Sequence, residues 1–165
     1  TDAVETTTEI TAMVFMILLG SSIFSLVFRG FGGDDLITGI FTELPGGTFG
    51  AVLVVMIIIF LLGFILDFIQ ITLVVVPIVG PALLMLGVDP IWLGIMIAIN
   101  LQTSFLTPPF GFALFYLRGV APDSLATKDI YRGVIPFILI QVGVLIALAL
   151  FPDLVTALPR AVYGS

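Results

Sequence analysis

The residues from Ile10 to Phe28 form a run of 19 without a charged side chain. As a helix, such a run is about 28 Å long, which is enough to cross the hydrocarbon layer of a membrane. Composition extends this constraint to the whole chain, because 60% of its 165 residues are hydrophobic, 10% are charged and the mean hydropathy is +1.32. A soluble domain of this length has no core that could bury so much apolar surface. The sequence therefore predicts an all-α integral membrane protein with several spans.

The chain lacks the residues that several classes of chemistry require. It contains neither cysteine nor histidine, which excludes disulfides, thiolate or histidine-ligated metals and serine–histidine hydrolases. Only one acid, Asp67, lies among the apolar runs, and no glycine-rich phosphate loop is present. We therefore expect neither enzyme activity nor a cofactor. The five basic residues form no patch for a nucleic acid.

Apolar runs and their interruptions predict the order of the elements. The run over 10–28 is a membrane span, and 34–44 reads as a short amphipathic helix in the interface or packed across other helices, with a solvated linker as the alternative. Further along, the sequence predicts a span over 49–66, a re-entrant hairpin over 67–88, a broken membrane helix over 90–117, a loop over 118–133, a last span over 134–151 and a tail over 152–165. The chain opens on TDAVETTTE, without an initiator methionine or a basic leader region, so we expect it to be part of a longer protein.

The hairpin is predicted from three helix-breaking residues, Pro77, Gly80 and Pro81, in the middle of 67–88. A proline inside a helix costs roughly 3 kcal/mol, because it loses a hydrogen bond and clashes with the preceding turn. Two arms of about 15 Å each that meet near the middle of the bilayer avoid this cost. Asp67 and Gln70 have the spacing of a capping box and are expected to cap the first arm. A kinked but continuous helix is the alternative.

The stretch NLQTSFLTPPFG, residues 100–111, interrupts the next apolar segment. Pro108 cannot donate to the carbonyl of Ser104, nor Pro109 to that of Phe105, so both acceptors are expected to be stranded in hydrocarbon. Neutral oxygens in such a cluster suit a small hard cation, as at the ion sites of secondary transporters. In the alternative, the helix only kinks and its hydroxyls bond to their own backbone. The predicted sodium-binding residues are Asn100, Thr103, Ser104, Phe105, Thr107, Pro108, Pro109 and Gly111, with Pro77, Gly80 and Pro81 at the substrate-facing hairpin tip.

Basic residues predict the orientation. If the hairpin enters and leaves on one side, Arg29 and the loop over 118–133 share the opposite face, and only Arg160 lies with the hairpin mouth. By the positive-inside rule, that loop is cytoplasmic and the hairpin opens outward.

The strings LDFIQITLVVVPIVGP, GVDP and NLQTSFLTPPFGFALFY resemble the large membrane subunit of TRAP (tripartite ATP-independent periplasmic) transporters, in its C-terminal portion and nearest the mannitol/chloroaromatic branch. The resemblance implies an inverted-repeat elevator in the bacterial inner membrane, in which sodium and substrate bind where hairpin tips meet broken helices. Asp67 matches the acid that opens the second hairpin, and Pro77 and Pro81 match its tip. Many members carry glycine in place of Ser104. The residues that match the broken-helix signature are Asn100, Thr107, Pro108, Pro109 and Gly111.

The resulting functional hypothesis is sodium-coupled uptake of a small organic acid, with sodium as the only metal. The implied partners are the rest of the large subunit, a small membrane subunit, a periplasmic solute-binding protein and the lipid bilayer, with no nucleic acid. A passive channel subunit with a re-entrant filter loop is the alternative.

Overall fold

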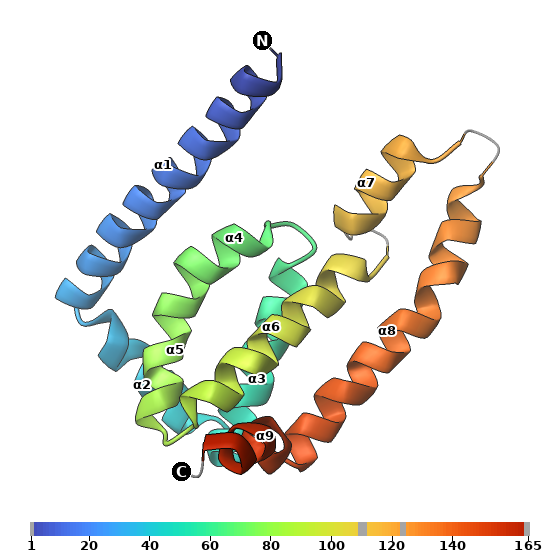
Figure 1. Cartoon of the computed structure of the whole chain (residues 1–165). Coiled ribbons are helices and arrows are strands. Elements are labelled where there is room, and N and C mark those ends of the chain that lie inside the picture. Colours follow the sequence, from blue (N-terminus) through green and yellow to red (C-terminus); the bar gives the residue numbers. More distant parts are fainter. Residues whose placement is uncertain (1, 109–111, 123–124, 164–165) are drawn as a thin grey trace. The chain divides into compact units, whose positions relative to one another are not determined.

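The computed structural model describes residues 2–108, 112–122 and 125–163, and these residues form helices and turns without a strand (Figure 1). The chain divides into two compact units, Thr1–Val52 with Asp67–Gly87 and Leu53–Leu66 with Val88–Ser165, called unit 1 and unit 2 below. By length and composition, three of the described helices could cross a membrane, or four if one bent pair counts as a span. This agrees with the predicted all-α membrane protein.

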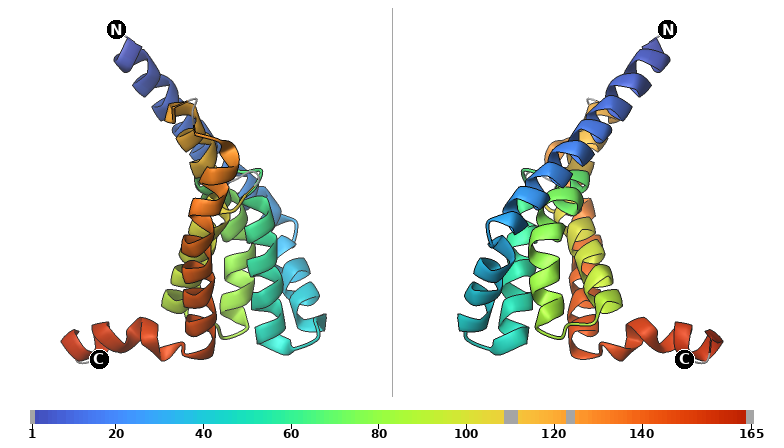
Figure 2. Two further views of the ribbon diagram at one scale, coloured as in Figure 1. Left: turned by 90° about the vertical axis from the view of Figure 1, so that its right-hand side faces the viewer. Right: turned by 90° about the vertical axis from the view of Figure 1, so that its left-hand side faces the viewer.

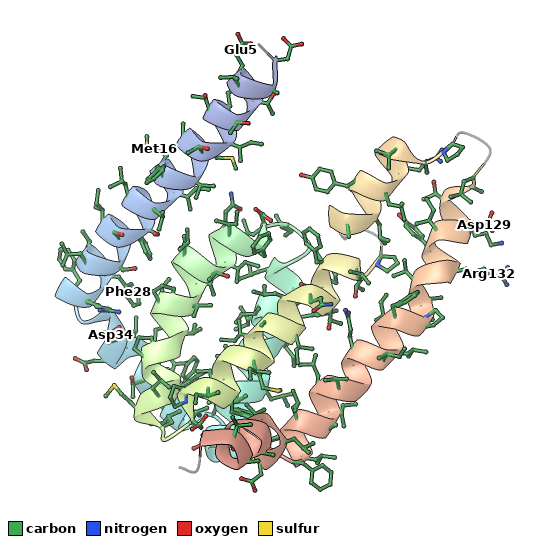
Figure 3. All side chains as sticks on the ribbon, in the orientation of Figure 1. Glu5, Met16, Phe28, Asp34, Asp129 and Arg132 are labelled. Carbon is green, nitrogen blue, oxygen red and sulfur yellow. The ribbon has the colours of Figure 1, made fainter. Side chains whose placement is uncertain are left out.

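Unit 1 begins with α1 (Asp2–Gly30), which is longer at both ends than the predicted span, and α2 (Gly33–Glu43). The turn between them is closely packed, since a Cβ atom at Gly33 would overlap the ring of Phe28. An ion pair between Arg29 Nε and Asp34 Oδ2, at 3.7 Å, joins the two helices, and Figure 3 shows Phe28 and Asp34 at this junction. The direction of α2 relative to α1 is therefore fixed by packing and charge.

A sharp corner separates α2 from α3 (Gly47–Leu62), with 114° between the two axes. Gly46 and Gly47 have φ angles of 94° and 58°, in the left-handed region that favours glycine. Gly50 lies so close to the carbonyl of Pro45 that a side chain has no room there. The sequence Pro45-Gly46-Gly47 thus forms the corner.

The segment after residue 67 differs from the prediction. It is one helical run made of α4 (Phe68–Gln70), the π-helix η1 (Ile71–Val75) and α5 (Val76–Met85), and it passes through Pro77, Gly80 and Pro81 without a turn. The amide of Val76 donates to the carbonyl of Ile71, five residues back, so the helix widens just before Pro77. Pro77 then lies in the first turn of α5, where the missing N–H of a proline costs little stability. The predicted tip at Pro77–Pro81 was therefore wrong.

The turn lies instead at residues 63–67, between α3 and α4. At the other end, within unit 1, the hydroxyl of Thr48 donates to the carbonyl of Leu86 at 3.3 Å. The start of α3 therefore meets the end of α5 within unit 1, and the segment 47–85 between these two ends is called the helical hairpin below. The capping box of Asp67 and Gln70 is present, with the Phe68 amide donating to Asp67 Oδ1 at 2.8 Å and the Asp67 amide to Gln70 Oε1 at 3.3 Å. It begins the second arm of this hairpin rather than the first arm predicted.

We expect Asp67→Ala to lower the free energy of unfolding by about 1 kcal/mol, because the first amides of α4 lose their acceptor. Asp67→Asn keeps an oxygen at the same place and should restore most of that loss. Thermal unfolding of the purified protein in detergent measures both. Asp35→Ala is the control, because Asp35 is exposed and the N-cap of α2 makes no side-chain bond. Equal effects of Asp67→Ala and Asp35→Ala would contradict the capping role.

Unit 2 contains the second part of α3 together with α6 (Pro90–Leu106), α7 (Phe112–Val120), α8 (Thr127–Leu150) and α9 (Asp153–Tyr163). Gly87, at φ 85°, ends α5, and the carboxylate of Asp89 accepts from the amide of Trp92 at 2.8 Å to begin α6. Helices extend into both ends of the predicted loop over 118–133, and Asp129 and Arg132 project from the first turns of α8 (Figure 3). The predicted tail after residue 151 contains the helix α9.

A hydrogen bond from the indole of Trp92 connects α6 to the end of α8. The Nε1–H of Trp92 donates to the carbonyl of Leu148 at 2.8 Å. In a continuing helix this carbonyl would accept from the amide of residue 152, but residue 152 is proline and has no N–H. Trp92 thus supplies the donor that the proline removes.

Candidate functional site

The predicted interruption is present in unit 2, where α6 ends at Leu106 and α7 begins at Phe112. Thr107 leaves the helix with φ −81° and ψ 123°, and its amide donates to the carbonyl of Ser104 at 3.1 Å. The carbonyl of Ser104 is therefore not stranded, contrary to the prediction, because the last turn tightens from a four-residue to a three-residue bond. The hydroxyl of Thr107 donates to the carbonyl of Thr103 at 2.7 Å. Phe105 and Pro108 are half-buried, and Pro109 and Gly111 lie outside the described residues.

Three hydroxyl groups lie along the last two turns of α6. Thr103 donates to the carbonyl of Ile99 at 2.7 Å, and Ser104 donates to that of Leu101 at 2.8 Å, in addition to the bond from Thr107. These hydrogen bonds agree with the alternative interpretation, in which the hydroxyls donate to carbonyls of their own helix. Each bond uses the hydroxyl hydrogen and leaves oxygen lone pairs for another partner. The side chains of Thr103 and Ser104 are both 1% exposed, so these oxygens are shielded from water.

Asn100 connects α6 to the second part of α3. Its Nδ2–H donates to the carbonyl of Met56 at 2.8 Å, and the residue is only 4% exposed. This bond commits the amide nitrogen to α3 and leaves Oδ1 of Asn100 as the acceptor. Asn100, one of the predicted sodium-binding residues, is thus held in one orientation by a hydrogen bond that the sequence does not reveal.

Gly63, the first residue of the turn after α3, lies against Ser104. A Cβ atom built on Gly63 would be 2.7 Å from Cβ of Ser104 and nearer still to its hydroxyl oxygen, and the carbonyl of Ile59 is 3.4 Å away. Real Cβ atoms do not approach so closely, so only glycine lets the turn close on the end of α6. Sequence analysis did not single out Gly63. Its signal was present, however, as a glycine at the end of an apolar run four residues before a capping aspartate.

The residues predicted for the hairpin tip have a different place. Pro77, Gly80 and Pro81 lie inside α5 in unit 1, and none of them is in the turn over 63–67. The capping residues Asp67 and Gln70 do lie at and just after this turn. Within unit 2, the structure thus brings together Asn100, Thr103, Ser104 and Thr107 and adds Gly63.

The site is built from amide and hydroxyl groups. Among the described residues, no group of three or more acidic, histidine or cysteine side chains could hold a metal ion. The residues at the end of α6 therefore offer neutral oxygens on a helix that stops inside an apolar segment. Such an arrangement is suited to a monovalent hard cation, which needs oxygen ligands but no full charge.

Comparisons with known proteins agree with this architecture. Residues 1–154 match the family described as "Tripartite ATP-independent periplasmic transporter, DctM component". The ectoine/5-hydroxyectoine TRAP transporter large permease protein of Ruegeria pomeroyi is 32% identical over 93% of the chain and 35% of its own length. The sialic acid TRAP transporter large permease protein of Vibrio cholerae is 26% identical over 96% of the chain and 36% of its own length. A C4-dicarboxylate TRAP transporter large permease protein of Pseudomonas aeruginosa is 30% identical over 92% of the chain and 35% of its own length.

No solved structure matches the chain. The chain spans about a third of the length of these curated relatives, at 35% and 36%. The family match covers both the helical hairpin and the interrupted helix of unit 2. From this match and the apolar helices, the chain belongs to the DctM family of large permeases of TRAP transporters.

Proposed function

We propose that this chain forms part of a permease that takes up a small organic acid across the bacterial inner membrane by coupling it to sodium entry. The relatives support the substrate class, since two of them are named for sialic acid and C4-dicarboxylates. A periplasmic solute-binding protein delivers the substrate, and a small membrane subunit and the rest of the large permease complete the assembly. The loop between α7 and α8 faces the cytoplasm, and the helical hairpin opens to the periplasm.

The observation that carries the proposal is the contact between the turn after α3 and the end of α6. Gly63 lies against Ser104, and Asn100 binds the carbonyl of Met56, so two chain interruptions meet at buried neutral oxygens. Helix ends and unwound backbone supply cation ligands in secondary transporters. We infer that sodium binds the hydroxyl oxygens of Thr103, Ser104 and Thr107 there.

Sodium binding would stabilise the state in which the turn is closed on α6. A ligand shifts a conformational equilibrium only as far as it binds one state better than the other. We infer that backbone carbonyls of the turn over 63–66 complete the shell of this ion, so that separating the turn from α6 removes ligands and the condition is met. In the proposed elevator, the hairpin and the interrupted helix then move together with the bound substrate.

The test is uptake by proteoliposomes that contain the complete large permease, the small subunit and the substrate-loaded binding protein. An inward sodium gradient should drive accumulation of the organic acid above its outside concentration, and collapse of the gradient should stop it. Equilibration without accumulation would indicate the passive channel instead. Accumulation that does not depend on sodium would overturn the sodium coupling.

We expect Thr107→Val to raise the sodium concentration for half-maximal uptake about tenfold, because a lost oxygen ligand worth about 1.4 kcal/mol changes affinity by that factor. Thr107→Ser keeps the oxygen and should remain close to the parent protein. Thr42→Val is the matched control, because Thr42 is exposed and also donates to its own helix, to the carbonyl of Gly39. An unchanged sodium dependence in Thr107→Val would remove Thr107 from the site.

A further inference from the structure

The helix α9 turns away from α8 after only Phe151 and Pro152, and both views in Figure 2 show it directed to the side of the α8 axis. The family match ends at residue 154, so almost all of α9 lies beyond it. Both helices belong to unit 2. The proposed sodium site includes no residue of α9.

The corner between α8 and α9 is a formed structure rather than a slack tail. The amide of Phe151 donates to the carbonyl of Ala147 at 2.8 Å, which completes the last bond of α8. The next carbonyl, that of Leu148, has lost its donor to Pro152 and accepts from the indole of Trp92 instead. The amides of Leu154 and Val155 then donate to the carbonyls of Phe151 and Pro152, each at 3.1 Å, and begin α9. These bonds set the direction of α9 relative to α8.

The exposed side chains around this corner are apolar except for that of Asp153. Leu150 and Phe151 are 68% and 62% exposed, and Leu154 and Val162 on α9 are 56% and 64% exposed. Leu154 and Val162 are eight residues apart and therefore lie within about 80° of each other around the helix, whereas Thr156 lies about 160° from Leu154 and about 120° from Val162. An apolar strip thus continues from the end of α8 along one side of α9.

The occupant of this strip follows from the position of α9 at the end of a membrane-length helix. α8 has 24 residues, and no residue in its most apolar stretch is buried. The surface of this stretch therefore suits contact with lipid. A helix that turns sideways where such a span ends lies at the level of the headgroups. Within α9, Asp153 and Arg160 carry opposite charges, so the helix has no net charge. Attraction to anionic lipid therefore does not account for the apolar strip. We propose that α9 is an interfacial helix that places Leu154 and Val162 against the acyl-chain boundary of the bilayer.

The test is the depth of spin labels on the complete permease in nanodiscs of zwitterionic lipid. This chain has no cysteine, so Leu154→Cys, Val162→Cys and Thr156→Cys are labelled one at a time after cysteines elsewhere in the permease are replaced. Collisions with oxygen report lipid, and collisions with a water-soluble nickel chelate report water. We expect the labels at 154 and 162 to favour oxygen by at least threefold relative to the label at 156, on the opposite side of the helix. Added salt should leave these ratios unchanged, because the helix has no net charge to screen.

Two results would overturn the proposal. If the nickel chelate reaches all three labels equally, α9 is a solvated extension. If the labels at 154 and 162 are shielded from both oxygen and nickel, the strip is covered by protein, either the rest of the permease or a partner. A double variant, Leu154→Gln with Val162→Gln, provides a second measurement. It should move the label at 156 no deeper into the bilayer. It should also make a label at 161, on a background of Ala161→Cys, at least threefold more accessible to nickel, because Ala161 lies about 20° from Leu154.

Discussion

Replacing Gly63 with alanine should abolish uptake and lower stability by about 1–3 kcal/mol, the usual cost of overpacking a filled site. The new methyl group would lie 2.7 Å from Cβ of Ser104, an atom next to the backbone that cannot rotate away. The turn over 63–67 would then be pushed off the end of α6, and the proposed sodium ligands would separate. Thermal unfolding and sodium-driven uptake measure the two effects.

The second substitution Ser104→Gly should rescue Gly63→Ala, because it removes both atoms that the methyl group overlaps. We expect the double variant to recover most of the lost stability and a measurable part of the uptake, which is the coupling that a double-mutant cycle detects between residues in contact. Gly94→Ala is the control. Gly94 lies in α6 with no atom within 4 Å of an added Cβ, so this change should be neutral or slightly stabilising. Additive losses from the two single substitutions would contradict the contact.

Asn100→Asp should also eliminate uptake at neutral pH. A carboxylate has no N–H to donate to the carbonyl of Met56, so two oxygen atoms would face each other at a site that is 4% exposed. Losing the bond and burying a charge together cost several kcal/mol. Asn100→Ala only removes the bond and should cost about 1–3 kcal/mol.

Gln102→Glu is the matched control for this change. It converts an amide to an acid two residues away, at a position that is exposed. We expect its unfolding temperature and uptake to stay close to those of the parent protein. If Asn100→Asp is as stable and as active as Gln102→Glu, the bond from Asn100 to Met56 does not orient the site.

Periodicity and breaker residues predicted most of the helices and the break after α6, because these depend on local backbone chemistry. Asp67 with Gln70, Asp89 with Pro90, and Pro45-Gly46-Gly47 all act at the helix ends where their residue types indicate. The position of the hairpin turn depended instead on a choice between two breaks in one apolar stretch. The prediction placed the turn at Pro77, Gly80 and Pro81, yet the π-turn before Pro77 accommodates the first proline inside the helix.

The contacts of the site could not be read from the sequence for a related reason. Asn100 binds a carbonyl 44 residues away, that of Met56, and Ser104 contacts a glycine 41 residues away, Gly63. Both contacts depend on how distant segments of the chain meet. Composition identified the oxygen donors of the site. It did not show that the amide of Thr107 satisfies the carbonyl of Ser104.

The chemistry of the residues at the end of α6 also bears on which ion can energise the transporter. From Asn100 to Pro108, the described side chains carry amide, hydroxyl and hydrocarbon groups and nothing that gains or loses a proton between pH 4 and pH 9. A proton needs a base to reside on, whereas a sodium ion needs only electron pairs. At the proposed site, a proton cannot take the place of sodium on residues 100–108, because none of their side chains is a base.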